Sequence, residues 1–213
     1  FSISGLVGMN LYQKTVGIIG TGKIGKAFVN ICNGFGMRVL AYDKFTSKEV
    51  KAKYVSLEEL YSESDIISLH CPLTNENNHM ICTESIEKMK DGVIILNTSR
   101  GSLIDAEALL DGIKSKKVGA ACLDVYEEET DLFFEDKSGH ILHDDTLARL
   151  LSMPNVIITS HQAFLTEEAL DSIAYTTIRN ISDFFAGKHI ENEICYNCES
   201  IGECKRNRRQ NCF

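Results

Sequence analysis

Residues 15–43 read TVGIIGTGKIGKAFVNICNGFGMRVLAYD, and this stretch carries the strongest indication of the fold. An apolar run of strand length leads into Gly20-Thr-Gly22-Lys-Ile-Gly25, a helix-like segment follows, and a second apolar run ends at Asp43. In a G-x-G-x-x-G turn the first glycine permits the tight turn, the second lets the backbone approach a pyrophosphate, and the third lets helix and strand pack closely. The pattern therefore predicts a strand–helix–strand unit that binds a dinucleotide.

Asp43 follows the second strand, 18 residues after Gly25. A carboxylate at this position hydrogen-bonds the hydroxyls of the adenine ribose in NAD, and it repels the additional phosphate of NADP. The N-terminus of the helix after the glycines offers free N–H groups to the phosphates. NAD is therefore the expected cofactor, and the alternative for Asp43 is a solvated residue at the end of a strand.

Further along the chain, apolar runs of strand length continue to alternate with helix-like stretches. Most of the runs are apolar throughout, as expected of parallel strands whose sheet is covered on both faces. The predicted strands are Thr15–Gly20, Arg38–Tyr42, Asp65–Leu69, Val93–Asn97, Gly119–Val125 and Val156–Thr159. The predicted helices are Lys23–Asn33, Leu57–Ser62, Glu84–Met89, Ala106–Lys114 and a last helix from Thr166 to a stop at Gly187. This order predicts an α/β fold with a doubly wound parallel sheet of the Rossmann type.

The chain of 213 residues is long enough for one large domain or two small ones. We expect residues 1–14 to be a connecting and dimerisation segment, residues 15–189 to form the NAD-binding domain that carries the catalytic residues, and residues 190–213 to be a divergent, disordered tail rich in Cys and Arg. Ser56 and Glu59 match an S-x-x-E capping box at the start of the second helix. The last helix has apolar residues at helical spacing, namely Leu170, Ile173, Ala174, Ile178, Ile181, Phe184 and Phe185.

The net charge of −8 and the sequence pI near 5.3 argue against nucleic acid or an anionic membrane surface as the main partner. No stretch is long and apolar enough to span a bilayer, and no basic residue precedes the apolar residues at the start, so neither a membrane span nor a signal peptide is expected. The eight cysteines are not spread as in a disulfide framework, which favours a reducing cytoplasm. The chain starts with Phe1 rather than Met, which indicates a fragment.

Three later strands are followed by polar residues, which are Thr98-Ser99-Arg100, the run from Asp124 to Glu129, and Ser160-His161. In such folds ligands lie beyond the carboxyl ends of the strands, so an arginine, a carboxylate and a histidine are expected at one crevice. Reduction of a 2-oxo acid needs a cation for its carboxylate or carbonyl, an acid that protonates the carbonyl oxygen, and an anion that keeps this acid charged. The three groups match these needs.

Five ordered motifs are similar to those of the D-isomer-specific 2-hydroxyacid dehydrogenases. They are GTGKIGKAFVNICNGFGMRVLAYD, HCPLT, NTSRGSLID, LDVYEEETDLFFEDKS and SHQAF, and the likeness runs from Phe1 to about Glu193. Within that family, the motifs most resemble those of the bacterial fermentative D-lactate dehydrogenases. The resemblance implies reduction of pyruvate by NADH to D-lactate, a small 2-oxo or 2-hydroxy acid as substrate, and a homodimer.

The resemblance also implies a role for individual residues of the motifs. Arg100 would bind the carboxylate and the carbonyl of the substrate, His161 would be the acid/base, and Glu129 would support the histidine. The cofactor contacts would fall on Gly20, Gly22, Lys23, Ile24, Gly25, Asp43, Cys71, Pro72, Asn77, Thr98, Ser99, Arg100 and Asp124, of which the last lies near the nicotinamide amide. No metal is expected in this site.

Each assignment has a plain alternative. Arg100 could be a surface ion-pair partner, and Glu129 stands in the acidic run Glu127–Glu129, from which composition alone does not select it. His70, also at the end of a strand, is the rival of His161, and position in the motif selects His161. For the whole chain, the alternatives are an NAD-sensing interaction protein like the C-terminal-binding corepressors and an NAD-binding module without turnover. The segment DLFFEDKS followed by SHQAF favours the dehydrogenase.

Two parts of the chain depart from the family pattern. The first domain of the family, which closes over the substrate, is absent, and we expect the fragment to be inactive for that reason. The tail reads CYNCESIGECKRNRRQNCF where the family chain ends or returns to its first domain. A four-thiolate zinc site is the alternative to a disordered basic tail, although the ligand spacing is irregular after the first pair; the cysteines are Cys195, Cys198, Cys204 and Cys212.

Overall fold

The computed structural model describes residues 7–127, 144–188, 190 and 192. The chain divides into two compact units, Phe1–Ala163 and Phe164–Phe213. The first unit contains the sheet, and the second contains the last helix. The domain limits expected from the sequence, after residues 14 and 189, stay a prediction.

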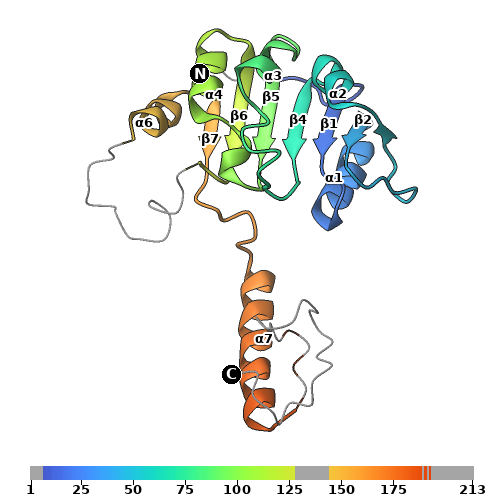
Figure 1. Cartoon of the computed structure of the whole chain (residues 1–213), viewed down its shortest axis with the longest axis vertical. Coiled ribbons are helices and arrows are strands. Elements are labelled where there is room, and N and C mark those ends of the chain that lie inside the picture. Colours follow the sequence, from blue (N-terminus) through green and yellow to red (C-terminus); the bar gives the residue numbers. More distant parts are fainter. Residues whose placement is uncertain (1–6, 128–143, 189, 191, 193–213) are drawn as a thin grey trace. The chain divides into compact units, whose positions relative to one another are not determined.

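The described part of the first unit is built on a seven-stranded parallel sheet with the strand order β3-β2-β1-β4-β5-β6-β7 (Figure 1). The strands are β1 (Thr15–Ile19), β2 (Arg38–Tyr42), β3 (Lys53–Tyr54), β4 (Ile66–Leu69), β5 (Val93–Asn97), β6 (Val118–Leu123) and β7 (Val156–Ile158). The chain moves one way across the sheet from β1 to β3 and the other way from β4 to β7. The boundary between β1 and β4 is therefore a topological switch point, where ligands bind at the carboxyl ends of the strands.

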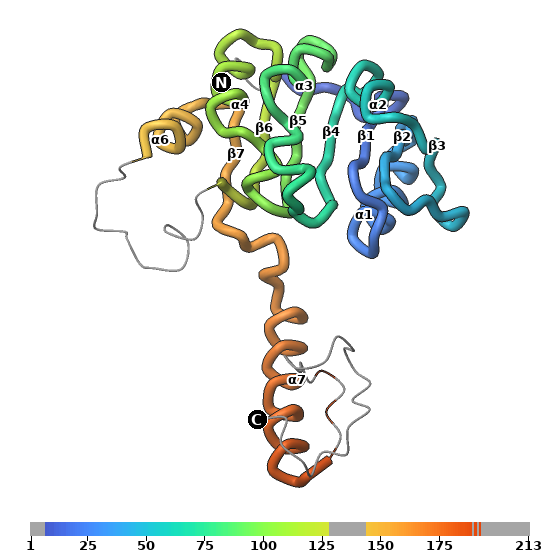
Figure 2. The backbone as a smooth tube through the Cα atoms, viewed as in Figure 1, coloured from blue at the N-terminus to red at the C-terminus, as the bar shows by residue number. Residues whose placement is uncertain are grey.

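Helices cover both faces of this sheet (Figure 2). The helices of the described residues are α1 (Lys23–Gly34), α2 (Leu57–Glu63), α3 (Thr83–Glu87), the short 3-10 helix η1 (Gly101–Leu103), α4 (Ala106–Lys114), α6 (Asp145–Ser152) and α7 (Glu167–Phe185). One core packs Val29 and Cys32 of α1 against Val16 and Ile18 of β1. The other core joins α2, α3, α4 and α6 to the strand residues that point the opposite way, such as Ile19. The strands are apolar throughout because both of their faces are buried.

The predicted fold class is confirmed, and each predicted strand and helix is present. Arg38–Tyr42, Val93–Asn97 and Ala106–Lys114 have the predicted bounds, and the ends of the other elements differ by at most two residues. β3, α6 and the short η1 were not predicted from the sequence. β3 has two residues at the edge of the sheet, and its Lys-Tyr pair gives no apolar run. α6 is a short helix that begins after Asp144, whose side chain accepts a hydrogen bond from Leu147 N at 2.8 Å.

Half of the predicted capping box forms at the start of α2. Ser56 Oγ accepts a hydrogen bond from Glu59 N at 3.2 Å, as predicted. The second predicted bond of the capping box, from Ser56 N to the Glu59 side chain, does not form. The Glu59 carboxylate instead accepts a hydrogen bond from Lys53 Nζ at 2.7 Å. A charged donor on the neighbouring strand β3 makes a stronger bond to the carboxylate than a backbone N–H does.

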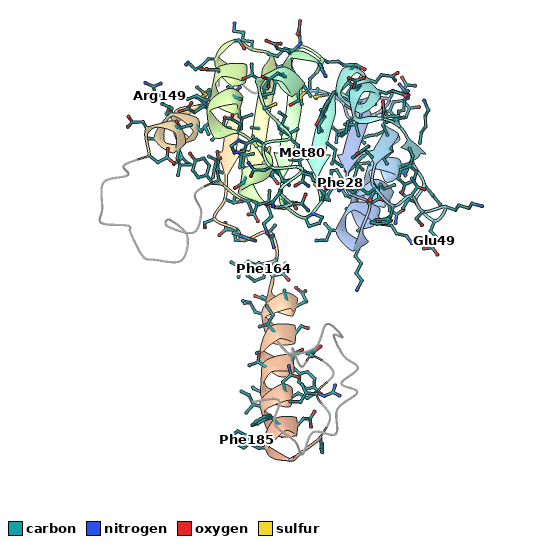
Figure 3. The ribbon with its side chains drawn as sticks, in the orientation of Figure 1. Phe28, Glu49, Met80, Arg149, Phe164 and Phe185 are labelled. Atoms are coloured by element: carbon teal, nitrogen blue, oxygen red, sulfur yellow. The ribbon has the colours of Figure 1, made fainter. Side chains whose placement is uncertain are left out.

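The last predicted helix is confirmed as α7, which lies in the second unit. Thr166 Oγ1 caps it by accepting a hydrogen bond from Ala169 N at 3.1 Å. No residue of α7 is buried, so its apolar positions are exposed, and Phe185 is labelled at one end of the helix in Figure 3. In the described part of the chain, no helix is long and apolar enough to cross a membrane.

Candidate functional site

The three glycines of the turn after β1 differ in what surrounds them. Gly20 has a φ of +94°, which residues other than glycine rarely adopt, and a Cβ there would lie 2.6 Å from Cys71 N. A Cβ on Gly25 would lie 2.0 Å from Gly20 O, so α1 packs directly on the turn. A Cβ on Gly22 would meet nothing within 4 Å. Gly20 and Gly25 are therefore required by the fold, whereas Gly22 leaves open space at the N-terminus of α1, where a pyrophosphate fits.

Alanine at Gly25 and alanine at Gly22 are expected to have different effects. Gly25→Ala forces α1 away from the turn, and overpacking of this kind lowers the free energy of unfolding by about 1–3 kcal/mol. Gly22→Ala should leave the unfolding temperature unchanged and weaken NADH binding by about tenfold or more, because the methyl group occupies the phosphate space. Thermal unfolding and a fluorescence titration with NADH measure the two effects. Normal NADH binding by Gly22→Ala would contradict the assignment of this space to the cofactor.

A cavity of about 410 Å³ lies beside this turn, at the switch point. Residues at the ends of β1, β2 and β4 and in the loop after β4 line it, namely Ile19, Gly20, Gly22, Tyr42, Asp43, Lys44, Phe45, Leu57, His70, Cys71, Pro72, Thr74, Glu76, Asn77 and Met80. Six expected cofactor residues are among them: Gly20, Gly22, Asp43, Cys71, Pro72 and Asn77. A mostly apolar hollow of this size with a few polar groups suits the adenosine half of a dinucleotide.

The other expected cofactor residues lie around this cavity rather than in its lining. Lys23 and Ile24 are exposed in the first turn of α1, where their backbone N–H groups belong to the free helix N-terminus. Thr98, Ser99 and Arg100 follow β5, and Asp124 follows β6. The structure therefore separates the expected contacts into an adenosine side and a substrate side.

The carboxylate of Asp43 is fixed by donors on both sides of it. Its Oδ2 accepts hydrogen bonds from Thr21 N at 2.6 Å and from Thr21 Oγ1 at 2.9 Å, and its Oδ1 accepts one from Phe45 N at 2.8 Å. Partial burial alone raises the pKa of Asp43, but these bonds and one from the backbone of Lys44 outweigh it, so the pKa lies below its usual value. Asp43 is therefore an anion at neutral pH, and it lines the cavity.

Asn77 braces the loop that follows β4. Its Oδ1 accepts hydrogen bonds from Thr74 N at 2.7 Å and from Thr74 Oγ1 at 3.1 Å, and its Nδ2 donates to Pro72 O at 2.8 Å and to Cys71 Sγ at 3.7 Å. Lys44, beside Asp43, forms an exposed ion pair with a glutamate of the same loop. Asn77 thus shapes the wall of the cavity with an amide that is already engaged by the protein.

The turn that carries Arg100 is held by a buried residue at the end of β5. Asn97 Nδ2 donates to Arg100 O at 2.9 Å, and Asn97 Oδ1 accepts a hydrogen bond from Ser99 N at 3.0 Å. Ser99 Oγ donates to Cys71 O at 2.5 Å, which ties this turn to the end of β4. The Arg100 side chain is exposed, with Nη1 donating to Ser99 O at 2.7 Å. A long cationic side chain is thus presented from a fixed backbone.

Asp124, which is 5% exposed, organises the segment that carries His161. Its Oδ1 accepts hydrogen bonds from the hydroxyl of Thr159 and from Gln162 N at 3.0 Å, and its Oδ2 accepts one from Ala163 N at 2.9 Å. Asp124 O also accepts a hydrogen bond from His161 N at 2.7 Å. His161 has a φ of +50°, a conformation that a histidine adopts when its surroundings impose it.

The electrostatics of Asp124 agree with this anchoring role. Burial alone raises its pKa, but the hydrogen bonds from Thr159, Ala163 and Gln162 and the charge of His161 outweigh burial and lower the pKa. Asp124 was expected to contact the nicotinamide amide. In the structure both of its carboxylate oxygens accept hydrogen bonds from the segment Thr159–Ala163, so it also positions that segment.

Two other histidines of the described residues have partners of their own. His70 lies at the end of β4, with its Nε2 2.9 Å from Ser68 Oγ and its ring 5.1 Å from the ring of Phe28, which Figure 3 labels. Burial lowers the pKa of His70 to about 4, so His70 is neutral at physiological pH and unsuited to donate a proton. His79 pairs with Glu127 through its Nε2, which engages one of the two alternatives to Glu129.

The remaining predictions concern residues outside the described part of the chain. Glu129 and Glu128 lie there, as do the four cysteines of the tail, Cys195, Cys198, Cys204 and Cys212. Among the residues that are described, no three His, Cys, Asp or Glu side chains come together as metal ligands. The assignment of Glu129 stays a prediction.

Two residues that hold the site were not predicted from the sequence: Thr21, which binds Asp43, and Asn97, which holds the turn of Arg100. Thr21 is the residue after the first glycine of the turn, and Asn97 is the last residue of β5. A polar residue that ends an apolar strand, and is fully buried there, is the pattern that could have identified Asn97. No pattern distinguishes Thr21, because its partner lies 22 residues away.

Residues 2–163 match the family model of the D-isomer specific 2-hydroxyacid dehydrogenase, NAD binding domain. The chain belongs to this family. The family predicted from the five motifs and its cofactor NAD are therefore confirmed. The chain is 52% identical over 197 residues to D-lactate dehydrogenase of Escherichia coli, a match that covers 91% of this chain and 60% of the relative. It is 49% identical over 208 residues to the aromatic 2-oxoacid reductase of Clostridium sporogenes, covering 96% of this chain and 60% of that protein.

A solved structure of D-lactate dehydrogenase with NAD+ from Lactobacillus jensenii resembles this chain with a TM-score of 0.81 and 32% sequence identity. The match covers 89% of this chain and 58% of that one. The chain spans about 60% of the length of the curated relatives it matches.

Proposed function

We propose that this chain is the NAD-binding and catalytic-residue part of an enzyme that reduces pyruvate, or a similar 2-oxo acid, to the D-2-hydroxy acid with NADH, as in fermentation. The observation that carries the proposal is the arrangement along the carboxyl ends of one parallel sheet. The cavity with Asp43, the turn with Arg100 and the segment with His161 follow β2, β5 and β7 in that order. The open space at Gly22 and the ionised Asp43 fit the phosphates and ribose of NAD.

In the proposed mechanism, bound NADH supplies the hydride that goes to C2 of the 2-oxo acid. Arg100 binds the carboxylate and carbonyl of the substrate through its planar guanidinium group. His161 donates a proton to the carbonyl oxygen as this oxygen becomes a hydroxyl. Asp124 keeps the backbone of His161 in place. Glu129 favours the charged form of the histidine, as a nearby carboxylate does.

The test combines a fluorescence titration with NADH and assays of 2-oxo acid reduction. The E. coli relative is named for D-lactate and the C. sporogenes relative for aromatic 2-oxo acids, so pyruvate and phenylpyruvate both belong in the assay. Assays are made on this chain and on the chain completed by an N-terminal domain. A completed protein that binds NADH without reducing either acid would support an NAD-sensing interaction protein instead, and absence of NADH binding would contradict both readings.

The proposed coenzyme preference follows Asp43. NADH is expected to bind at least tenfold, or about 1.4 kcal/mol, more tightly than NADPH, because the carboxylate repels the 2′-phosphate. Asp43→Ser removes this charge and should narrow the difference between the two dissociation constants. Titration of both coenzymes against the unmutated and the substituted chain measures it. Equal affinities in the unmutated chain would refute the preference.

A cytoplasmic homodimer without nucleic-acid or membrane partners completes the proposal. The described residues contain four free cysteines, Cys32, Cys71, Cys82 and Cys122, which supports a reducing compartment. The segment 1–14 is proposed to contribute to the dimer, and light scattering of the purified protein determines the oligomeric state.

A further inference from the structure

The hydrogen bonds of Asp43 continue to the edge of the sheet. Thr21 Oγ1, which donates to Asp43, lies 2.9 Å from Tyr54 Oη, and Tyr54 Oη accepts a hydrogen bond from Ser47 N at 3.2 Å. Tyr54 belongs to β3, where it pairs with a residue of β2, and its ring packs against the core that contains α1. A side chain outside the lining of the cavity is therefore linked to Asp43 through a single hydroxyl group.

The direction of these bonds follows from the number of protons. Thr21 has one hydroxyl proton, and the ionised Asp43 accepts it, so Thr21 Oγ1 accepts its bond from Tyr54. Tyr54 in turn accepts from the backbone N–H of Ser47 and donates to Thr21. The chain runs from a backbone donor through two hydroxyl groups to a carboxylate, and bonds in such a chain polarise and strengthen one another.

The position of Asp43 limits how strongly the protein can reject NADP. Asp43 is only partly buried, so its side chain could turn towards water when a 2′-phosphate approaches. Discrimination against NADP cannot exceed the free energy of moving the carboxylate away, since a displaced carboxylate no longer repels the phosphate. The bonds from Thr21 and Phe45 make that movement unfavourable.

We propose that Thr21 and Tyr54 are positioning residues for coenzyme choice, which hold the Asp43 carboxylate where it receives the ribose hydroxyls of NAD and where it cannot swing away from the 2′-phosphate of NADP. The inference deepens the proposed preference for NAD and rests on it. Tyr54 contributes from the edge strand β3, and Thr21 contributes from the turn between β1 and α1.

The experiment measures the ratio of the NADPH and NADH dissociation constants by fluorescence titration of the full chain. Thr21→Val removes the hydroxyl group and keeps both the branched shape and the backbone N–H, and it should narrow the ratio about threefold or more. Tyr54→Phe keeps the ring in the core and removes the outer hydroxyl, and it should narrow the ratio roughly twofold. Thr21→Ser retains the hydroxyl and should restore the ratio of the unmutated chain.

Two controls separate positioning from a general loss of structure. Tyr61→Phe also removes one tyrosine hydroxyl bond, to Met80 O at 3.2 Å, but that bond does not reach Asp43, so any effect should be equal for the two coenzymes. In an Asp43→Ser background, Thr21→Val and Tyr54→Phe should leave the ratio unchanged, because the residue through which they act is gone.

The possible outcomes are distinct. A ratio that narrows in Thr21→Val and Tyr54→Phe, and does so only when Asp43 is present, supports the inference. An unchanged ratio in Thr21→Val and Tyr54→Phe, or one that narrows equally in the Asp43→Ser background, overturns it and leaves the proposed preference for NAD intact. A ratio near one in the unmutated chain overturns the preference and this inference together.

Discussion

The 213-residue chain should bind NADH and reduce pyruvate at a rate no higher than background, and the same chain fused behind the N-terminal domain of a relative should produce D-lactate. The chain spans about 60% of the length of those relatives, yet the cavity with Asp43 is complete within it. Holding the substrate against the nicotinamide with water excluded can account for about 7–11 kcal/mol of a reaction barrier. A cleft with one wall cannot supply that positioning, so the fusion should change turnover by several orders of magnitude.

The fusion needs a variant that separates chemistry from folding. His161→Ala in the fused protein should bind NADH as tightly as the unmutated fusion and produce almost no D-lactate, because the proton donor is lost. His70→Ala is not a suitable control, since His70 lines the cavity. Rapid pyruvate reduction by the unfused chain would show that the cleft is closed in another way.

Asp124→Asn is expected to reduce turnover of the fused enzyme by about 100-fold, although it replaces only one oxygen with an NH2 group. Both carboxylate oxygens of Asp124 accept hydrogen bonds, from Gln162 N and the Thr159 hydroxyl on one side and from Ala163 N on the other. An asparagine has one oxygen, so its amide group must face an N–H or O–H donor. The misplacement of His161 that follows is of the size that can cost about two orders of magnitude in rate.

The same substitution should lower the free energy of unfolding by about 1.5–3 kcal/mol, since hydrogen bonds to a charged group are lost. The matched control is Asp105→Asn, because Asp105 accepts one backbone bond at the start of α4 and asparagine caps a helix equally well. The lowered pKa of Asp124 means that its stabilisation is present above the unfolded pKa and disappears as the pH falls through the folded one. Asp124→Asn should therefore flatten the loss of stability in acid, and unchanged thermal unfolding and turnover would contradict the anchoring role.

The fold could be predicted from the sequence largely because parallel strands buried on both faces are apolar throughout. Such runs stand out against their surroundings, and Arg38–Tyr42 and Val93–Asn97 were bounded correctly for that reason. β3 escaped detection because its two residues are held by pairing with β2 at the edge of the sheet, so no local pattern specifies it. The local spacing of apolar residues predicts whether a segment is a helix or a strand, whereas the pairing of an edge strand depends on residues elsewhere in the chain.

The candidate site was predictable where a motif fixes the backbone and not where a side chain reaches across the fold. The glycine turn and Asp43 follow from spacing, and in the structure Gly20 has a positive φ, Gly25 packs against the turn and Asp43 accepts a hydrogen bond from Thr21 N. The link from Tyr54 to Thr21 joins residues 33 positions apart, and the bond from Ala163 to Asp124 joins residues 39 apart. No sequence pattern predicts hydrogen bonds over these separations, because the bonds form only once the strands lie side by side in the folded sheet.

The order of the strands along the chain differs from their order across the sheet. Of the seven strands, β1 comes first in the described sequence, but it lies between β2 and β4, so its neighbours on both sides are added after it. The residues that line the adenosine cavity end at Met80, whereas Arg100, Asp124 and His161 come later in the chain. A ligand that binds a folded form stabilises it by mass action. A coenzyme bound in this cavity would therefore stabilise only chains in which β1, β2 and β4 have paired, because residues at the ends of these three strands line it.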